Sequence, residues 1–303
     1  MEIRTLNYFL AVASEENITN AARKLHMTQP SLSRQMMELE RELGKPLFIR
    51  TNKKTMLTED GVHLKQRAQE ILSLVEKTAT EFRSTWEEIY GEVSIGAGET
   101  DVMRRFAQVM KHIQELHPRI TFSLYSGNAE DILEKLNDGL LDFGLVFSTT
   151  VTEKYHYLTV PFTNKRGVLV RRDSPWAAYE KITPALLKQM PLITSSRVSY
   201  TQSFLSQWLP GDWEKLNIVA NYNLIYNAVF LVEAGVGNAM CLENLVNTSG
   251  GSPVCFLPLD PPSYAALTLV WKREKPLSKA AELFLAEIRK VLGPGNEPSI
   301  KGY

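Results

Sequence analysis

Gln29, Ser31, Ser33 and Arg34 are hydrogen-bonding side chains on the polar side of a short predicted helix. Side chains of these types can contact base edges in the major groove of DNA. In principle, arginine pairs bidentately with guanine and glutamine with adenine, each pair giving about 1–3 kcal/mol of base discrimination. The sequence predicts a surface that reads DNA here, without defining which base each residue contacts.

Two amphipathic helices around a tight turn must position these side chains, and their apolar residues recur at helical spacing. The residues in question are Ile18, Ala21, Ala22 and Leu25 before the turn, Leu32, Met36, Leu39 and Leu43 after it, and Leu6, Phe9, Leu10 and Ala13 in a preceding helix. Thr28 suits an N-cap and Pro30 a first turn, so the second helix is predicted to begin at Thr28 or Gln29. We interpret His26, in the turn, as a packing residue. The pattern is typical of a helix-turn-helix with a three-helix core.

Positive charge gathers around this predicted helix-turn-helix. Residues 23–54 contain eight Lys and Arg against three acids, a net charge of +5, whereas the whole chain is neutral. Short apolar pieces at 47–48 and 56–57 flank a polar stretch that contains Arg50, Lys53 and Lys54. We interpret this stretch as a two-stranded wing with a basic tip, and the charge favours contact with phosphates.

A long helix is predicted after the wing, because Thr58 can cap it and two acids follow in its first turn. It runs to about residue 89 with an apolar stripe: Leu64, Ala68, Ile71, Val75, Ala79, Phe82, Trp86 and Ile89. Such a stripe favours lengthwise packing on a second copy of the helix. The alternative is that the stripe packs on the helix's own domain.

From residue 91 the pattern alternates between strands and helices, and the crossovers of the βαβαβ unit up to residue 147 predict a parallel sheet. Strands are expected at 93–95, 120–124, 143–147, 167–170, 192–193, 217–219 and 265–271, with helices around 106–113, 132–136, 224–234 and 278–292. A second α/β unit is expected to start near residues 160–162. The tail 293–303, rich in Gly and Pro, is expected to be disordered.

The N-terminal stretch is similar to LysR-type transcriptional regulators at many positions: Leu6, Phe9, Ala21, Ala22, Leu25, residues 28–33, Leu39, Glu40, Leu43, Gly44, Leu47, Phe48, Arg50, Thr51, Leu57, Thr58 and Gly61. Gly127, residues 136–142 and residues 234–237 resemble landmarks of the family's effector-binding domain. The resemblance implies a winged helix-turn-helix at 1–58, a linker helix at 59–90 and a two-lobed α/β domain at 91–303, like a periplasmic binding protein with two hinge strands. Lobe I would comprise about 91–161 and 266–292, and lobe II about 162–265.

Carried over residue by residue, the resemblance implies DNA contact by Thr28, Gln29, Pro30, Ser31, Ser33, Arg34, Arg50, Lys53 and Lys54. Gln29, Ser31, Ser33 and Arg34 would face the major groove, while Thr28 and the wing would hold phosphates or reach the minor groove. It also implies a homo-oligomer, a dimer or a tetramer. Double-stranded promoter DNA and RNA polymerase are the other expected macromolecular partners.

Loops at the carboxyl ends of strands should line a cleft between the lobes. The candidates are Gly98, Glu99, Thr100, Ser126, Asn128, Phe147, Thr149, Ser195, Ser196, Arg197, Tyr226 and Asn227. Their polar groups suit a small metabolite, and a helix beginning near Thr100 could offer N–H groups to a carboxylate. Because Glu99 and Asp101 would repel an anion, a cationic or zwitterionic effector is the alternative to a carboxylate.

Other functional classes find little support in the sequence. Gly96 and Gly98 lack the third glycine of a dinucleotide fingerprint, the five His and two Cys show no metal-ligand spacing, and no G-x-S-x-G elbow is present. We therefore expect no cofactor and no enzymatic activity. Two cysteines without a signal peptide or membrane-length apolar run predict a cytoplasmic protein that makes no membrane contact. An architectural DNA binder, or an enzyme on the two-lobed domain, is the alternative to a ligand-responsive regulator.

Overall fold

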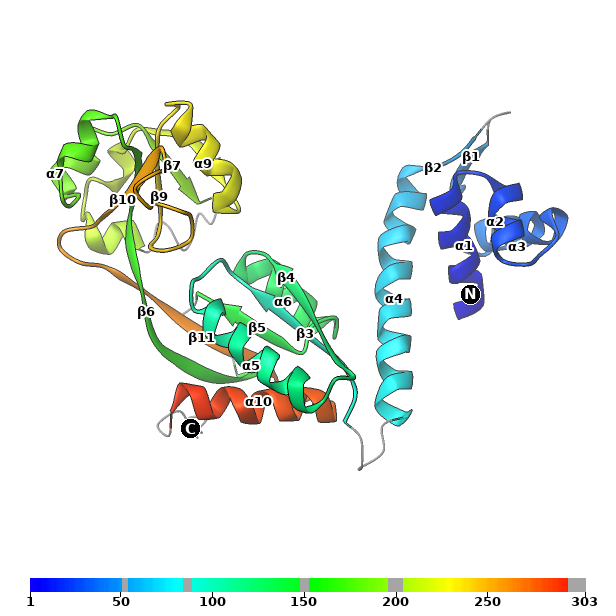
Figure 1. Ribbon diagram of the computed structural model, residues 1–303. Coiled ribbons are helices and arrows are strands. Elements are labelled where there is room, and N and C mark those ends of the chain that lie inside the picture. Colours follow the sequence, from blue (N-terminus) through cyan, green and yellow to red (C-terminus); the bar gives the residue numbers. More distant parts are fainter. Residues whose placement is uncertain (51–53, 84–88, 148–152, 196–203, 294–303) are drawn as a thin grey trace. The chain divides into compact units, whose positions relative to one another are not determined.

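The computed structural model describes residues 1–50, 54–83, 89–147, 153–195 and 204–293 of the chain (Figure 1). The chain forms two units, Met1–Arg83 and Ser84–Tyr303. The long helix predicted between two domains therefore belongs to the N-terminal unit. Residues 84–88 of its predicted continuation, part of the wing tip and the tail 294–303 lie outside the described residues. Ile89, which was predicted to end the helix, is not helical and packs against the core of the second unit.

The N-terminal unit is a winged helix-turn-helix, as the sequence predicts. Its elements are α1 (Ile3–Glu15), α2 (Ile18–Lys24), α3 (Gln29–Leu43), β1 (Phe48–Arg50), β2 (Thr55–Leu57) and α4 (Glu59–Arg83). β1 and β2 pair antiparallel to form the wing. Thr58 caps α4 as expected, because its hydroxyl accepts the N–H of Gly61 at 3.0 Å.

One small core holds this unit together. Phe9, Leu32 and Met36 are fully buried in it, and Ala68 of α4 packs into the same core. The first half of α4 therefore covers its own unit, while Ile71, Leu74 and Val75 further along remain exposed. Within the predicted stripe, Ala68 is thus buried, whereas Ile71 and Val75 are exposed.

Two predictions about this unit are wrong. Leu43 is 39% exposed, because α3 ends there and Gly44 follows with φ +67°, turning the chain away from the core. His26 is exposed and makes no packing contribution; its φ of +54° lets the chain turn after α2. At this turn Met27 donates its N–H to Ala22 and His26 donates to Arg23, which is the hydrogen-bond pattern of a Schellman motif.

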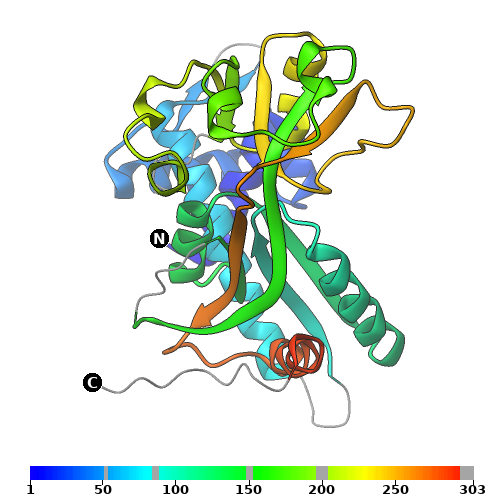
Figure 2. The same cartoon turned by 90° about the vertical axis from the view of Figure 1, so that its left-hand side faces the viewer.

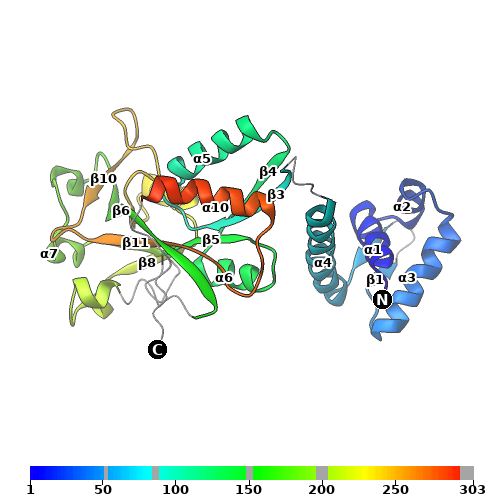
Figure 3. The ribbon, with the colours of Figure 1, turned by 90° about the horizontal axis from the view of Figure 1, so that it is seen from below.

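The second unit contains two lobes, as predicted. Lobe I has the parallel strands β3 (Gly91–Ala97), β4 (Ile120–Ser126) and β5 (Phe143–Val146), with α5 (Met103–Leu116), α6 (Ala129–Asn137) and α10 (Lys279–Leu292). α5 and α10 cover one face of the sheet and α6 the other (Figure 3). Both faces are buried, which explains the nearly continuous apolar strands β3 and β5.

Lobe II repeats this layered plan. Its elements are β7 (Leu192–Ser195), β8 (Ile218–Tyr222), β9 (Asn238–Leu242) and β10 (Val254–Pro258), with η1 (Pro175–Ala178), α7 (Pro184–Leu187), a helical turn at 204–208, η2 (Trp213–Lys215) and α9 (Ile225–Glu233). Val168 and Val170 enter the core under α7, whereas Leu169 between them enters the core under α9. This alternation is what a strand buried on both faces requires.

Two strands, β6 (Tyr155–Arg171) and β11 (Tyr264–Lys272), connect the lobes (Figure 2). The first half of β6 pairs with β11, and its second half pairs with β9 and β10 of lobe II. The register with β11 shifts between Ala265 and Leu267, beside the Val160–Pro161 segment of β6. Proline has no N–H to donate, so an interrupted ladder accommodates it. These strands match the two expected hinge strands.

The strands predicted for lobe II were incomplete. β6 is one strand of 17 residues, whereas only 167–170 was predicted within it. β9 and β10 were not predicted, because their apolar residues follow a Gly-rich turn and a Ser-Gly-rich loop without clear alternation. β8 extends to Tyr222, three residues beyond the predicted end.

Candidate DNA interface and effector pocket

Helix α3 presents a polar face away from its core residues. Thr28, Gln29, Pro30, Ser31 and Arg34 are exposed, and Ser33 is half-buried. Among the described residues, no ion pair or hydrogen bond engages the Arg34 guanidinium. The face is therefore free to meet a groove at the N-terminal end of the helix, where backbone N–H groups also favour phosphate.

Thr28 occupies the N-cap position, with φ −78° and ψ 144°, and Pro30 lies in the first turn, as predicted. The Thr28 side chain makes no capping hydrogen bond. Its hydroxyl therefore remains available to a phosphate, which is the role that the resemblance implies. This role and the base contacts of the other residues stay predictions.

Acidic side chains hold the wing against the helices. The Glu40 carboxylate of α3 accepts the N–H groups of Leu47 at 2.8 Å and Phe48 at 3.1 Å. At the other strand, Thr55 donates its N–H to the Glu16 carbonyl, and Lys54 Nζ lies 2.7 Å from Glu16 Oε2. This bond lowers the pKa of Glu16 and raises that of Lys54.

Lys54, predicted to contact phosphate, is thus already paired within the unit. A phosphate would have to compete with Glu16 or share the ammonium group with it. Arg50 ends β1, so its backbone lies in the wing as predicted. Lys53 lies outside the described residues.

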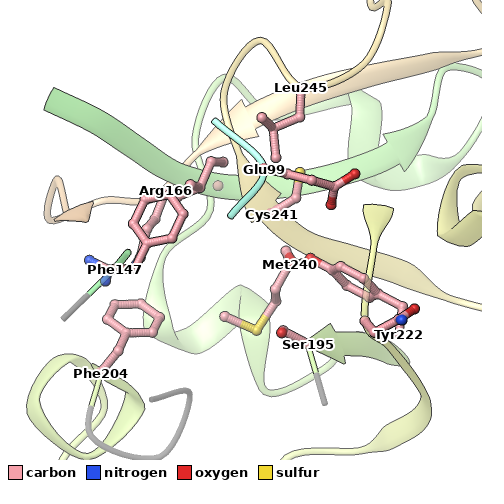
Figure 4. A pocket seen from close by; sticks show the side chains of 12 residues that line it. Glu99, Phe147, Arg166, Ser195, Phe204, Tyr222, Met240, Cys241 and Leu245 are labelled. Carbon is pink, nitrogen blue, oxygen red and sulfur yellow. Dashed lines mark hydrogen bonds between the residues drawn. The ribbon is translucent and has the colours of Figure 1, made fainter. Parts of the chain in front are cut away.

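In the second unit, one cavity of about 100 Å³ is lined from both lobes (Figure 4). Lobe I contributes Glu99 and Phe147, from the loops after β3 and β5. Lobe II and β6 contribute Arg166, Gly167, Ser195, Phe204, Tyr222, Asn223, Met240, Cys241, Leu242 and Leu245. Six of the lining residues lie at or just beyond carboxyl ends of parallel strands, which is where such domains bind ligands: Glu99, Phe147, Ser195, Tyr222, Asn223 and Leu242. We call this cavity the inter-lobe pocket.

Glu99 joins the lobes across the inter-lobe pocket. Its Oε2 accepts the N–H of Ile225 at 2.6 Å, the first residue of α9 in lobe II. Leu224, the N-cap residue of α9, supplies no side-chain cap. A carboxylate from lobe I therefore satisfies the positive end of a lobe II helix. Nearby, Asn244 donates to Asp101 at 3.2 Å, a second bond between the lobes.

Arg166 provides the positive charge of the inter-lobe pocket. Its Cζ lies 4.3 Å from the Phe204 ring centroid, a cation–π arrangement. Its Nη1 donates to Ser263 Oγ at 3.2 Å and to the Tyr264 carbonyl of β11. The guanidinium is thus held in place by aromatic and backbone groups.

Thr100 contacts the strands that connect the lobes rather than the pocket. It is buried, accepts the N–H of Val102 at 3.2 Å and donates to Asn164 Oδ1 of β6 at 2.5 Å. Asn164 in turn donates to the Ala265 carbonyl of β11 at 3.5 Å. Helix α5 begins at Met103, and the N–H groups of Met103 and Arg104 donate to the carbonyls of Thr100 and Asp101. The N–H groups that were predicted to be free for an anion are therefore already bonded.

Three of the predicted effector residues, Glu99, Phe147 and Ser195, line the inter-lobe pocket, and the other predicted residues that the structure describes are not part of its lining. Gly98 donates its N–H to Leu145, Asn128 caps α6 by accepting the Asp131 N–H at 2.8 Å, and Ser126 is exposed at the end of β4. Tyr226 and Asn227 are exposed on α9. Thr149, Ser196 and Arg197 lie outside the described residues.

Sequence reasoning missed most of the lobe II lining. Tyr222 is the last residue of β8 and Asn223 follows it, whereas the predicted candidates Tyr226 and Asn227 lie further along, on α9. Met240, Cys241 and Leu242 belong to β9, which was not predicted. Arg166 lies inside β6, and the expectation that ligands bind at the carboxyl ends of strands does not point to such a position.

The two cysteines are free thiols. Burial, and to a smaller extent the Glu99 charge, raises the pKa of Cys241 to about 12. Burial also raises the pKa of Cys255. Since the thiolate is the nucleophilic form, Cys241 is protonated and weakly reactive at neutral pH. It therefore acts as an apolar wall of the inter-lobe pocket.

The fold and its sites define a class of protein in which a winged helix-turn-helix is joined to a two-lobed domain with a pocket between the lobes. A family model described as a bacterial regulatory helix-turn-helix protein of the lysR family matches residues 3–62. A second, the LysR substrate binding domain, matches residues 87–293. This chain therefore belongs to the LysR family of transcriptional regulators, and its function is that of a DNA-binding regulator with an effector-binding domain.

Individual relatives support this assignment. The Hca operon transcriptional activator HcaR of Escherichia coli (strain K12) is 30% identical, over 96% of this chain and 98% of HcaR. The HTH-type transcriptional regulator BsdA of Bacillus subtilis (strain 168) is 40% identical over 47% of this chain and 49% of BsdA. Full-length CbnR in complex with its target DNA has the same fold, with a TM-score of 0.73 and 21% identity over 96% of this chain and 99% of CbnR.

None of the helices that the structure describes is long and apolar enough to span a bilayer. Within the described residues, no group of three or more His, Cys, Asp or Glu side chains could hold a metal ion.

Proposed function

We propose that α3 reads an operator through Gln29, Ser31, Ser33 and Arg34, and that an effector in the inter-lobe pocket modulates this binding. One observation carries the second part: the inter-lobe pocket is lined from both lobes, and Glu99 of lobe I, which lines it, accepts a hydrogen bond from α9 of lobe II. A ligand that binds better to one arrangement of the lobes shifts the population toward that arrangement. The loop containing Glu99 is bonded through Thr100 to β6, so such a shift reaches the connecting strands.

The proposed effector is a small, largely apolar molecule with polar ends. Phe147, Phe204 and Leu245 supply apolar walls, while Glu99 and Arg166 supply opposite charges. A carboxylate suits Arg166, because guanidinium and carboxylate pair bidentately. The N-terminus of α9 does not favour an effector carboxylate, because the Glu99 carboxylate occupies it. An amino or hydroxyl group suits Glu99.

We propose that the protein is a homo-oligomer, a dimer or a tetramer, that acts in the cytoplasm on promoter DNA with RNA polymerase and carries out no catalysis. The exposed apolar side chains Ile71, Leu74 and Val75 of α4 support self-association, because burying them against a second copy removes apolar surface from water. The solved complex of CbnR with its target DNA supports DNA as the partner.

The test combines ligand screening with DNA binding. The full-length protein is screened by thermal shift against carboxylates, amino acids and neutral aromatics. A ligand at 100 times its Kd should stabilise the folded state by about 2.7 kcal/mol. Fluorescence anisotropy with a DNA site selected from a random pool then measures whether that ligand changes DNA affinity. We expect the ligand to change the DNA affinity severalfold.

A matched pair of variants locates the effector. Leu245→Trp fills the inter-lobe pocket and should abolish the thermal shift, whereas Leu245→Met keeps its volume and should retain it. A hit that ignores Leu245→Trp would contradict the assigned pocket. A hit that binds there without any effect on DNA would favour the architectural binder, and turnover of the hit would favour an enzyme.

A further inference from the structure

A second cavity of about 340 Å³ lies in lobe I, between β6, β11 and α10. Figure 3 shows α10 beside these strands. His156 of β6 pairs in register with Trp271 of β11, and their ring centroids are 5.5 Å apart. Leu277 and Leu285 complete an apolar lining. The cavity therefore offers flat and aliphatic surface to a small molecule.

The rim of this cavity is strongly cationic. Its lining contains the four permanent cations Lys272, Arg273, Lys275 and Arg289, against a single acid, Glu282. The whole chain, in contrast, is neutral. Such a concentration of one charge in a concave site raises the local concentration of anions.

The lysines and arginines of this rim differ in how they are engaged. Lys272 Nζ donates to the Asn137 carbonyl at 2.8 Å, and Lys275 Nζ lies 3.3 Å from Asp142 Oδ1. Arg273 forms no ion pair or side-chain hydrogen bond with the described part of the chain. Arg289 likewise forms no ion pair or side-chain hydrogen bond there, and its Cζ lies 6.0 Å from the Trp271 ring centroid. Two guanidinium groups thus remain to bind an anion.

The positive charges of Arg273 and Arg289 both act on His156, which lines the cavity. Its pKa is lowered first by burial and then by the positive charges of Arg273 and Arg289. Both arginines, from different elements, therefore act on one ring that lines the cavity. An anion held between them would offset their repulsion of one another.

We propose that this cavity of lobe I is a second ligand site, for a small anion with two or more negative charges, such as a polycarboxylate or a phosphate ester. Arg273 and Arg289 bind its oxygen atoms, since guanidinium groups form strong, bidentate hydrogen bonds with carboxylate and phosphate. Trp271 and Leu285 contact its carbon skeleton. The cavity volume admits a metabolite of modest size.

The site is separate from the inter-lobe pocket. His156 and Arg166 lie ten residues apart on β6, which corresponds to as much as about 33 Å along an extended strand. Yet both sites are built on that strand. A ligand bound in lobe I therefore contacts the N-terminal end of β6, whose C-terminal half lines the inter-lobe pocket.

Isothermal titration calorimetry of the full-length protein with citrate and with pyrophosphate tests the proposal, at constant ionic strength set with KCl. Saturable binding of at least one anion is expected. The double substitution Arg273→Gln with Arg289→Gln should weaken it at least tenfold. Both side chains are exposed, and an unchanged Tm will show that the fold is retained. A preference for citrate or pyrophosphate distinguishes carboxylate from phosphate recognition.

Two single substitutions sharpen the result. Lys290→Gln removes a neighbouring charge of α10 that does not line the cavity, and it should leave the affinity within twofold. Glu282→Gln removes the only acid of the lining and should tighten binding severalfold. Equal affinity in the double variant would overturn the proposal, because the anion would then bind elsewhere, including at Arg166. Absence of saturable binding by either anion would overturn it as well.

Discussion

Helix α3 and the inter-lobe pocket are built in opposite ways. On α3, residues for structure and for DNA contact occupy different faces of one continuous helix, so Met36 is fully buried and Arg34 is exposed. In the pocket, the lining comes from several separate segments, and Glu99 both lines the cavity and joins the lobes. Function should therefore be separable from stability on α3 and coupled to it in the pocket.

Met36 and Met37 give the largest test of this separation, because they are adjacent and identical in type. Met36 is 0% exposed and Met37 is 51% exposed. Met36→Ala leaves a cavity in the core and should lower the free energy of unfolding by about 2–5 kcal/mol. Met37→Ala should change it by less than about 0.5 kcal/mol. Urea denaturation of the full chain measures both, and equal losses would contradict the two-faced helix.

Arg34→Ala tests the functional face. Specific DNA binding should weaken by about 1–3 kcal/mol, because a bidentate base contact is lost, while non-specific binding falls less. The unfolding midpoint should remain unchanged, because Arg34 is exposed. Arg41→Ala, in the last turn of the same helix, is the matched control and should affect both kinds of DNA alike. Anisotropy titrations with specific and scrambled DNA measure the difference, and equal losses for Arg34→Ala would exclude base readout.

Thr100→Val tests the coupling expected of the second unit. It removes a buried hydroxyl that donates to Asn164 and accepts from Val102, at a cost of about 1–3 kcal/mol. Because this hydroxyl ties the Glu99 loop to β6, effector response should decline together with thermal stability. Thr100→Ser keeps the hydroxyl and should retain both. Loss of effector response at unchanged stability would instead make Thr100 a direct ligand contact, as the sequence first suggested.

The same contrast explains how far the sequence could be interpreted. The helix-turn-helix follows from local signals, so the start of α3, the wing and the cap at Thr58 were predicted nearly residue by residue. The pocket depends on register and on strands without local signals. The expectation that ligands bind at the carboxyl ends of strands predicted Glu99, Phe147 and Ser195. It could not predict Arg166, which lines the pocket from within β6.

The resemblance to LysR-type regulators did not predict the remaining pocket residues either. It identified the domains and the hinge strands, which are shared features of the fold. It gave no information on the Glu99 bond to α9, which depends on one side chain from lobe I reaching a helix of lobe II. Likewise, exposure of Leu43 follows from the position at which Gly44 ends α3. Such details are decided by packing between distant segments.

His26→Gly gives the smallest expected effect and tests how local the N-terminal unit is. His26 adopts φ +54° at the end of α2, a conformation that costs most residues about 1–2 kcal/mol and costs glycine almost nothing. Because histidine tolerates this region better than most residues, and glycine makes the unfolded chain more flexible, the gain in unfolding free energy should be about 1 kcal/mol or less. His26→Ala retains the steric cost and should give no gain. Thermal unfolding measures both variants. Since the turn is satisfied within residues 22–27, the thermal shift caused by an effector in the second unit should stay unchanged in His26→Gly, whereas it should fall in Thr100→Val.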